Sequence, residues 1–319
     1  MNYYRFDPMG KEKSAMVDGV VGFQHRSGCA IDKESVGFEV LVRTIEGYLA
    51  HPNFSSVLLI GLGCEVNSTE NYSLSEPATL VVQREGSTSN TVAEAIRLID
   101  SFIEKDSQLR RVKIPASELI VGLQCGGSDS FSGLTANPSL GKASDLLVRN
   151  GGSVVLSETP EIYGAEGVLK ARATNKDVVT KIEEKIAWWQ EYVGTNGSTL
   201  NNNPSKGNLD GGVTTILEKS LGAVTKGGSS PLVEVVDYAE KPQSRGLIFM
   251  DSPGFDSVSV TGQTASGCHL ICFTTGRGST FGSLPSPVLK ICSNDEVSVF
   301  MNEDMDVSTE FALSTLGGL

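Results

Sequence analysis

The chain has 319 residues, 39% of them hydrophobic, which is enough for about two globular domains with their own cores. Its formal net charge of −12 argues against nucleic acid or an anionic membrane as a partner, and no apolar run approaches the ~20 residues that cross a bilayer. Because the first residues lack the apolar core of a signal peptide, we expect a cytoplasmic protein whose six cysteines form no disulfide framework.

The first 115 residues show two kinds of hydrophobic spacing. Intervals of three and four predict helices, and short apolar runs predict strands. The predicted helices are at 35–50 and 91–105, and the predicted strands at 57–62 and 79–83. His51 is predicted to sit at the end of the first helix, and Asn90 to cap the second. The basic segment 110–115 is interpreted as a connector.

The remaining residues repeat the alternation of strand and helix. The predicted strands are at 119–123, 153–156, 246–250 and 269–273, and the predicted helices at 142–149, 161–172, 176–193 and 214–221. This alternation predicts an α/β architecture of two Rossmann-like units with mostly parallel sheets, at 1–115 and 116–319. No Gly-x-Gly-x-x-Gly segment opens a helix after a strand, so a dinucleotide site is not supported. The polar segment 194–212 is long enough to be functional or disordered.

Several predicted strands end beside glycines and a chemically reactive side chain. Cys125 follows the strand at 119–123, Cys64 follows the strand at 57–62, and Arg277 lies between two glycines after the strand at 269–273. Cys29 also follows a glycine. Since ligands of open α/β sheets bind outside the carboxyl ends of the strands, these tips predict a site. The alternatives are buried core cysteines, a hydrogen-bonded structural histidine at 25 and a loop-anchoring ion pair for Arg277.

A set of motifs then resembles a known family. The motifs are Cys125-Gly-Gly-Ser-Asp129, Asn203-Pro-Ser-Lys-Gly-Asn208, Glu218-Lys-Ser-Leu-Gly222, Phe249-Met-Asp-Ser-Pro-Gly254 and Phe273-Thr-Thr-Gly-Arg-Gly-Ser279. With His25, Gly61-Leu-Gly-Cys-Glu65 and Asp304-Met-Asp306, they resemble the altronate/galactarate dehydratase family from about residue 20 onward. The residues of these motifs most resemble those of the altronate branch. The large subunit of sulfolactate sulfo-lyase is a further relative.

The resemblance implies a hydro-lyase that removes water from a sugar acid such as altronate and leaves a 2-keto-3-deoxy acid. It implies iron, with single Fe²⁺ and an iron–sulfur cluster both left open. Family members carry a small β-rich domain before this segment and continue beyond it, so we expect this chain to lack both ends. We expect a homo-oligomer or a separate N-terminal domain or subunit as its partner. Sulfite elimination and a non-catalytic sugar-acid-binding fragment are the alternatives.

Dehydration of a sugar acid needs a base beside the carboxylate, a cation for the charge that develops, and help for the leaving hydroxyl. The acid–base candidates are His25, Glu65, Asp129 and Glu158. The substrate-binding candidates are Ser130, Asn137, Lys206, Asn208, Thr275, Arg277 and Ser279. The metal candidates are Cys29, Cys64 and Cys125, which we expect to converge. The segment 194–212 is predicted to close over the site with Lys206 pointing inward.

Overall fold

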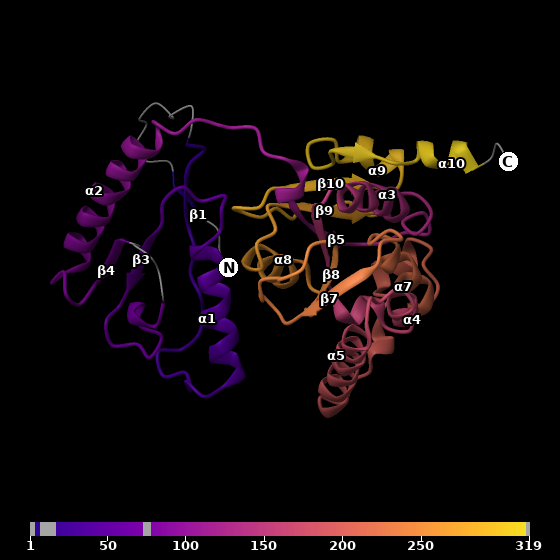
Figure 1. Ribbon diagram of the computed structural model, residues 1–319, viewed down its shortest axis with the longest axis horizontal. Coiled ribbons are helices and arrows are strands. Elements are labelled where there is room, and N and C mark those ends of the chain that lie inside the picture. The colour runs from indigo at the N-terminus through magenta and orange to yellow at the C-terminus, as the bar shows by residue number, and fades with distance from the viewer. Residues whose placement is uncertain (1–3, 7–16, 73–77, 317–319) are drawn as a thin grey trace. The chain divides into compact units, whose positions relative to one another are not determined.

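The structure is a computed structural model that describes residues 4–6, 17–72 and 78–316 (Figure 1). The chain divides into two compact units, Met1–Ile114 and Pro115–Leu319. Within the described ranges, no helix is both long enough and apolar enough to cross a membrane.

The first unit contains both helices expected there. Its elements are β1 (Tyr4–Phe6), β2 (Val20–Gly22), α1 (Val36–Leu49), β3 (Leu58–Gly61), β4 (Ala78–Val81) and α2 (Thr88–Asp106), with a 3₁₀ turn at Thr69–Asn71. Strands β3 and β4 pair in parallel, whereas β1 and β2 pair antiparallel. The prediction that Asn90 caps α2 was wrong. The cap is Ser87, whose hydroxyl accepts a hydrogen bond from the Asn90 backbone amide, so the helix begins earlier.

The second unit is built on a seven-stranded, all-parallel sheet in the order β11-β10-β9-β5-β6-β8-β7. Its strands are β5 (Ile120–Cys125), β6 (Ser153–Leu156), β7 (Leu232–Val236), β8 (Leu247–Met250), β9 (Leu270–Thr275), β10 (Val288–Cys292) and β11 (Val307–Ser308). The predicted α/β class with mostly parallel strands is confirmed.

Helices cover both faces of this sheet. The helices of the second unit are α3 (Ala136–Arg149), α4 (Glu166–Lys170), α5 (Lys176–Thr195), α6 (Lys206–Asp210), α7 (Ile216–Thr225), α8 (Asp256–Ala265), α9 (Asp295–Phe300) and α10 (Phe311–Leu316). One core joins α3, α5 and α7 to the sheet through residues such as Leu140, Ile182 and Val224. A second, smaller core joins Val260 of α8 to Ile248 and its neighbours. The sheet is therefore buried on both sides, which explains its continuous apolar strands.

Two predicted helices differ from those observed. The helix expected at 161–172 is a 3₁₀ turn, Thr159–Ile162, followed by the short α4. The helix expected at 142–149 begins at Ala136, because Pro138 lies in its first turn, where a missing amide hydrogen has no helical partner to lose.

The direction in which successive strands are added to the sheet changes at β5. Strands β6, β7 and β8 lie on one side of β5, and β9, β10 and β11, which come later in the chain, lie on the other. In open parallel sheets such a switch point leaves a crevice outside the carboxyl ends of the two strands that flank it. Here those ends are Cys125 of β5 and Thr275 of β9.

Candidate active site

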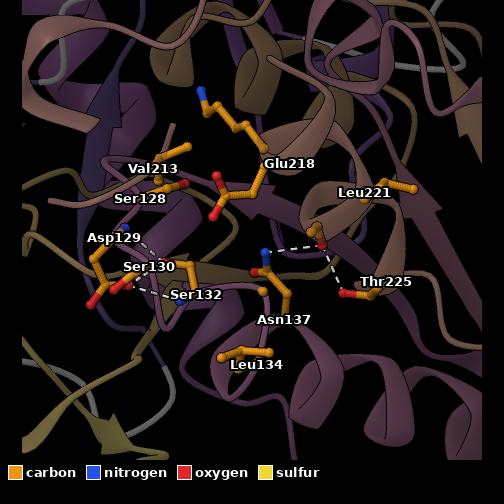
Figure 2. A pocket seen from close by; sticks show the side chains of 13 residues that line it. Ser128, Asp129, Ser130, Ser132, Leu134, Asn137, Val213, Glu218, Leu221 and Thr225 are labelled. Atoms are coloured by element: carbon orange, nitrogen blue, oxygen red, sulfur yellow. Dashed lines mark hydrogen bonds between the residues drawn. The ribbon is translucent and has the colours of Figure 1, made fainter. Parts of the chain in front are cut away.

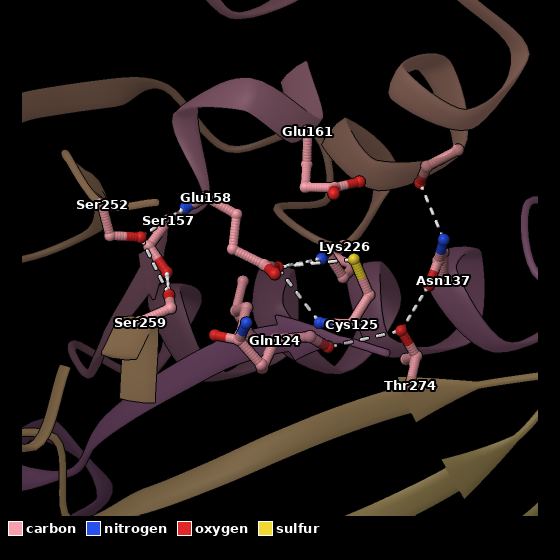
Figure 3. Close-up of polar contacts among 12 residues, drawn as sticks. Gln124, Cys125, Asn137, Ser157, Glu158, Glu161, Lys226, Ser252, Ser259 and Thr274 are labelled. Carbon is pink, nitrogen blue, oxygen red and sulfur yellow. Dashed lines mark hydrogen bonds and ion pairs between the residues drawn. The ribbon is translucent and has the colours of Figure 1, made fainter. Parts of the chain in front are cut away.

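Cys125, at the end of β5, lies beside the buried ion pair of Lys226 and Glu158 (Figure 3). Its backbone amide and its thiol both donate to Glu158 Oε2, at 3.1 and 3.4 Å. The same oxygen lies 3.2 Å from Lys226 Nζ, and these lysine and glutamate side chains are only 1% and 2% exposed. Burial, followed by the neighbouring Glu158 carboxylate, raises the pKa of the Cys125 thiol to about 12.

Glu158 occupies an unusual backbone conformation for a residue with a side chain. It follows β6 with φ 71° and ψ 66°, in the left-handed region. Its amide donates to Ser252 Oγ at 2.9 Å, which ties it to the end of β8. Among the described residues nothing donates to its second oxygen, Oε1. A strained, buried carboxylate with one oxygen unused indicates a functional group, not a packing element.

A second buried pair lies beside the first. Lys219 Nζ, on α7, is 2.5 Å from Glu161 Oε2, and these side chains are 8% and 9% exposed. The amide group of Asn203 contacts both partners, donating to Glu161 Oε1 at 2.9 Å and accepting from Lys219 at 3.1 Å. Gly254 leaves room for this arrangement, since a Cβ there would lie 3.0 Å from Glu161 Oε1.

The two pairs share their surroundings with a further acid, Asp256 at the start of α8. The cluster thus sets the carboxylates of Glu158, Glu161 and Asp256 against the ammonium groups of Lys219 and Lys226. Burial raises the pKa of Glu158, as it does that of Asp256, and neighbouring carboxylates push both in the same direction. Burial alone would lower the pKa of Lys226, but the facing acidic groups raise it. Burial and the neighbouring carboxylates therefore favour the protonated forms of Glu158 and Asp256.

Asp129 has a different environment from that expected of a catalytic base. Its carboxylate accepts hydrogen bonds from the Ser132 amide, the Ser132 hydroxyl, Ser293 Oγ and Asn294 Nδ2, at 2.7 to 3.0 Å. A Cβ on Gly276 would lie 2.2 Å from its Cγ. Asp129 therefore ties together the loops that follow β5, β9 and β10, and these contacts fit an anchoring role.

Arg277 is the exposed cation at the switch point. A Cβ added to Gly127 would lie 3.1 Å from its Cβ, and one added to Gly211 would lie 3.2 Å from its Cδ. These two glycines therefore let the aliphatic stem lie against backbone. Within the part of the chain that the structure describes, nothing pairs with its guanidinium group, so a loop-anchoring ion pair is not found there. A guanidinium group with no protein partner, on a stem that packs against backbone, is suited to bind a carboxylate ligand.

Two of the predicted substrate-binding residues hold the strand tips together. Asn137 accepts from Thr274 Oγ1 at 2.6 Å and donates to the Gly222 carbonyl at 3.0 Å, joining α3, β9 and α7. Thr275 donates from its hydroxyl to the Gly127 carbonyl at 3.0 Å and accepts from the Arg277 amide at 3.2 Å. It thereby fixes the start of the Arg277 turn.

The segment 194–212 contacts the β5 tip through residues other than Lys206. Asn208 is buried and accepts from the Ser128 amide at 2.8 Å, and Gly211 accepts from the Ser130 amide at 2.9 Å. Lys206 begins α6 and is exposed, so the expectation that it points inward was wrong. Its position at the first turn of a helix leaves its flexible stem in solvent. Ser279 lies past the Arg277 turn, where its hydroxyl accepts from the Phe281 amide at 3.1 Å.

A pocket of about 330 Å³ lies beside the cluster (Figure 2). Its polar wall comes from the loop after β5 and from α3, and its opposite wall from α7. The lining residues are Ser128, Asp129, Ser130, Ser132, Gly133, Leu134, Asn137, Val213, Glu218, Lys219, Leu221, Gly222 and Thr225. Lys219 belongs both to this lining and to the buried pair with Glu161, so the pocket is adjacent to the charged cluster. Its hydroxyl and amide groups suit a small polyhydroxylated ligand.

The remaining candidates lie in the first unit. His25 is exposed, with Nε2 3.4 Å from Asn67 Nδ2, and Cys29 accepts through its carbonyl from the Val66 amide at 2.9 Å. Cys64 is exposed and its sulfur accepts from Gln83 at 3.3 Å. Glu65 caps the end of β3. Burial acts to raise its pKa, but the backbone amides of this turn outweigh it and lower that pKa.

The donor types in the first unit fit iron, although the side chains are not assembled around one point. In the ranges that the structure describes, no group of three or more His, Cys, Asp or Glu side chains is placed to hold a metal ion. Cys29 and Cys64 lie on segments joined by a backbone hydrogen bond, with His25 near, and thiolates and imidazole are ligands that iron accepts. Cys125 fits less well, because it is already enclosed by Glu158 and Lys226. Convergence of the three cysteines stays a prediction.

Four members of the cluster were missed by sequence reasoning, namely Glu161, Lys219, Lys226 and Asp256. Lys219 lies inside the motif Glu218-Lys-Ser-Leu-Gly222, which was noticed but not assigned a role. Lys226 follows the last turn of α7, where a lysine normally interacts with the helix dipole in solvent. Glu161 follows Pro160 directly, and its proximity to the end of β6 was the available signal.

Fold and cluster together define an α/β protein whose second unit has an open, all-parallel sheet with buried lysine–glutamate pairs at its switch point. Residues 116–315 match the family described as D-galactarate/Altronate dehydratase, C-terminal, and residues 4–107 match D-galactarate dehydratase/Altronate hydrolase, second domain. The chain belongs to the D-galactarate/altronate dehydratase family.

Individual relatives are similar across most of this chain. It is 38% identical to the altronate dehydratase of Bacillus subtilis over 292 residues, covering 89% of this chain and 57% of that protein. It is 38% identical to the galactarate dehydratase (L-threo-forming) of Escherichia coli over 282 residues, covering 84% and 54%. It is 34% identical to the (2R)-sulfolactate sulfo-lyase subunit beta of Chromohalobacter salexigens, covering 85% and 71%. The chain thus spans little more than half the length of the two dehydratases.

Proposed function

We propose that this chain carries the reaction centre of a hydro-lyase that dehydrates a sugar acid such as altronate to a 2-keto-3-deoxy acid. The observation that carries the proposal is the buried Lys226–Glu158 pair, which lies at the switch point beside a second pair and a polar pocket. Family membership supports the same class of reaction. Arg277 adds an unpaired cation next to the loop that lines the pocket.

In this proposal Glu158 is the base. Its free oxygen Oε1 takes the proton from the carbon next to the substrate carboxylate, while Lys226 and the Cys125 amide hold Oε2 in place. Arg277 binds the carboxylate with its forked guanidinium and stabilises the charge that develops there. Lys219, a residue of the pocket lining, donates a proton to the departing hydroxyl.

Iron would be held by the donors of the first unit, Cys29, Cys64 and His25. When bound, it would supply Lewis-acid chemistry. Ser130 and Ser279, on loops, and Asn208, on α6, complete the proposed binding surface, and Lys206 is kept as an exposed cation at the start of α6.

The test is turnover by anaerobically purified protein supplied with Fe²⁺, using altronate, galactarate and sulfolactate in parallel and detecting the keto acid or sulfite. We expect altronate to be turned over and Glu158→Gln to lose at least 100-fold in kcat. The matched control is Glu183→Gln, which removes a carboxylate from the solvent-exposed pair with Lys170. It should leave kcat within about twofold.

Each alternative corresponds to a distinct outcome. Sulfite release without keto-acid formation from altronate would assign the sulfo-lyase reaction instead. Calorimetric binding of altronate without turnover would indicate a binding fragment. A Glu158→Gln protein that is folded and as active as the Glu183→Gln control would remove Glu158 from the reaction.

A further inference from the structure

The long segment 194–212 reaches the charged cluster through one side chain, that of Asn203. This residue precedes α6 and is half-buried, whereas its neighbours Asn201 and Asn202 are exposed. The 3₁₀ turn before it is fixed by the buried Leu200, so the position of Asn203 is set by packing as well as by polar contacts.

The Asn203 amide contacts the two members of the Lys219–Glu161 pair with opposite ends. Its NH₂ group donates to Glu161 Oε1 at 2.9 Å, and its carbonyl accepts from Lys219 Nζ at 3.1 Å. An amide is neutral and carries both a donor and an acceptor, so it satisfies both charges without adding one. Aspartate has nearly the same shape, but it lacks the donor and would place another carboxylate against Glu161.

The same segment also holds the opposite side of the pocket. Asn208 binds the Ser128 amide, Gly211 binds the Ser130 amide, and the backbone of Gly211 lies against the stem of Arg277. Of these residues, Asn203 is the one whose side chain contacts charged groups of the cluster, namely Glu161 and Lys219. Its effect should therefore be on the orientation of Lys219 and not only on the shape of the pocket.

We propose that Asn203 is a positioning residue that holds the Lys219 ammonium and the Glu161 carboxylate in register for the acid step of the reaction. The kinetic consequence of this inference rests on the proposed function, whereas the contact of Asn203 with Lys219 and Glu161 is observed independently of it. Lys219 is one of the residues that line the pocket, and its ammonium contacts Glu161 and Asn203, which therefore set its orientation. Losing the amide would let the ammonium turn toward Glu161 alone.

The kinetic test compares Asn203→Asp with Asn201→Asp, the same change two residues earlier at an exposed position. We expect Asn203→Asp to lower kcat at least tenfold, to change KM less than threefold, and to shift the acidic limb of the pH–rate profile upward. The upward shift follows because an added carboxylate raises the pKa of the acids beside it. The control should reproduce the parent values. If Asn203→Asp does not fold, Asn203→Ala takes its place.

A second readout needs no turnover. Lysine acetylation by acetic anhydride, followed by peptide mass spectrometry, gives the rate of Lys219 modification relative to the exposed Lys142. We expect Asn203→Ala to raise this ratio several-fold and Asn201→Ala to leave it unchanged. Should the parent protein turn over no sugar acid, the proposed function fails and this ratio alone decides the role of Asn203. An unchanged ratio, or an Asn203→Asp enzyme with the parent kcat and pH profile, overturns the proposal.

Discussion

Replacing Lys226 by methionine should destabilise the second unit strongly. The change keeps most of the side-chain volume but removes the ammonium that faces Glu158, and both side chains are almost wholly buried. Breaking a buried ion pair by removing one partner costs about 3–5 kcal/mol, because the other charge stays in a poorly solvated place. The exposed pair of Lys170 with Glu183 is the matched comparison, and Lys170→Met should cost less than about 1 kcal/mol.

The loss should depend on pH with a sign set by Glu158. Burial raises its pKa in the folded protein, and removing Lys226 leaves less to oppose that rise. The folded state then holds a proton that the unfolded state releases above its ordinary carboxyl pKa. Stability of Lys226→Met is therefore greatest near pH 5 and falls toward pH 8, by at most about 1.4 kcal/mol per pH unit.

The assay is urea unfolding at pH 5.5, 6.5 and 8, followed by tryptophan fluorescence. Both tryptophans of the chain, Trp188 and Trp189, are in α5, so the signal reports on the second unit alone. The double variant Lys226→Met/Glu158→Gln should recover most of the loss at pH 8, since no buried charge remains. Equal stability of Lys226→Met and Lys170→Met at pH 8 would show that the pair is not buried as described.

Two further predictions concern the other cations. Arg277→Ala should reduce kcat/KM for the sugar acid by a factor that corresponds to a loss of about 2–5 kcal/mol in transition-state binding. Arg277→Lys should recover little of this loss, because lysine lacks the forked geometry of a guanidinium group. A folded Arg277→Ala protein with parental efficiency would leave Arg277 outside the site. Lys219→Met should lower kcat at least tenfold while Lys142→Met, at an exposed position on α3, should not, as measured by initial rates. Equal rates for the two variants would exclude Lys219 as the acid.

The strands predicted most accurately were those with an uninterrupted apolar run between turn residues. Ser153–Leu156 was predicted to the residue, because glycines precede it and Ser157-Glu158 follows. Helix α8 was not predicted, since its buried side is made of Ser259, Thr264 and other small polar residues instead of an apolar stripe. The Ser259 hydroxyl hydrogen-bonds with those of Ser157 and Ser252, which follow β6 and β8, and a hydrophobic pattern does not reveal such contacts.

The candidate site was predictable where its residues sit at strand ends and was not where they come from helices. Glu158 and Arg277 follow β6 and β9, so the position of their strands was enough to select them. Lys226 pairs with a carboxylate 68 positions earlier in the chain, and no local signal distinguishes it from a solvated lysine. Asp129 was chosen for its position, but its occupied oxygens depend on Ser293 and Asn294, which only the folded sheet brings near.

The order of strands also bears on how the protein is made. β5 is central in the sheet, yet its partner β9 is encoded far later, and the contact between Ile120 and His269 spans 149 positions. At about 5–20 residues per second, a ribosome needs roughly 7–30 s to supply the missing neighbour. Throughout that interval one edge of an apolar strand has no partner and can pair with another chain. Yield in a cell should therefore depend on chaperone supply and translation speed between β6 and β9, and silent codon changes there could alter it without changing any residue.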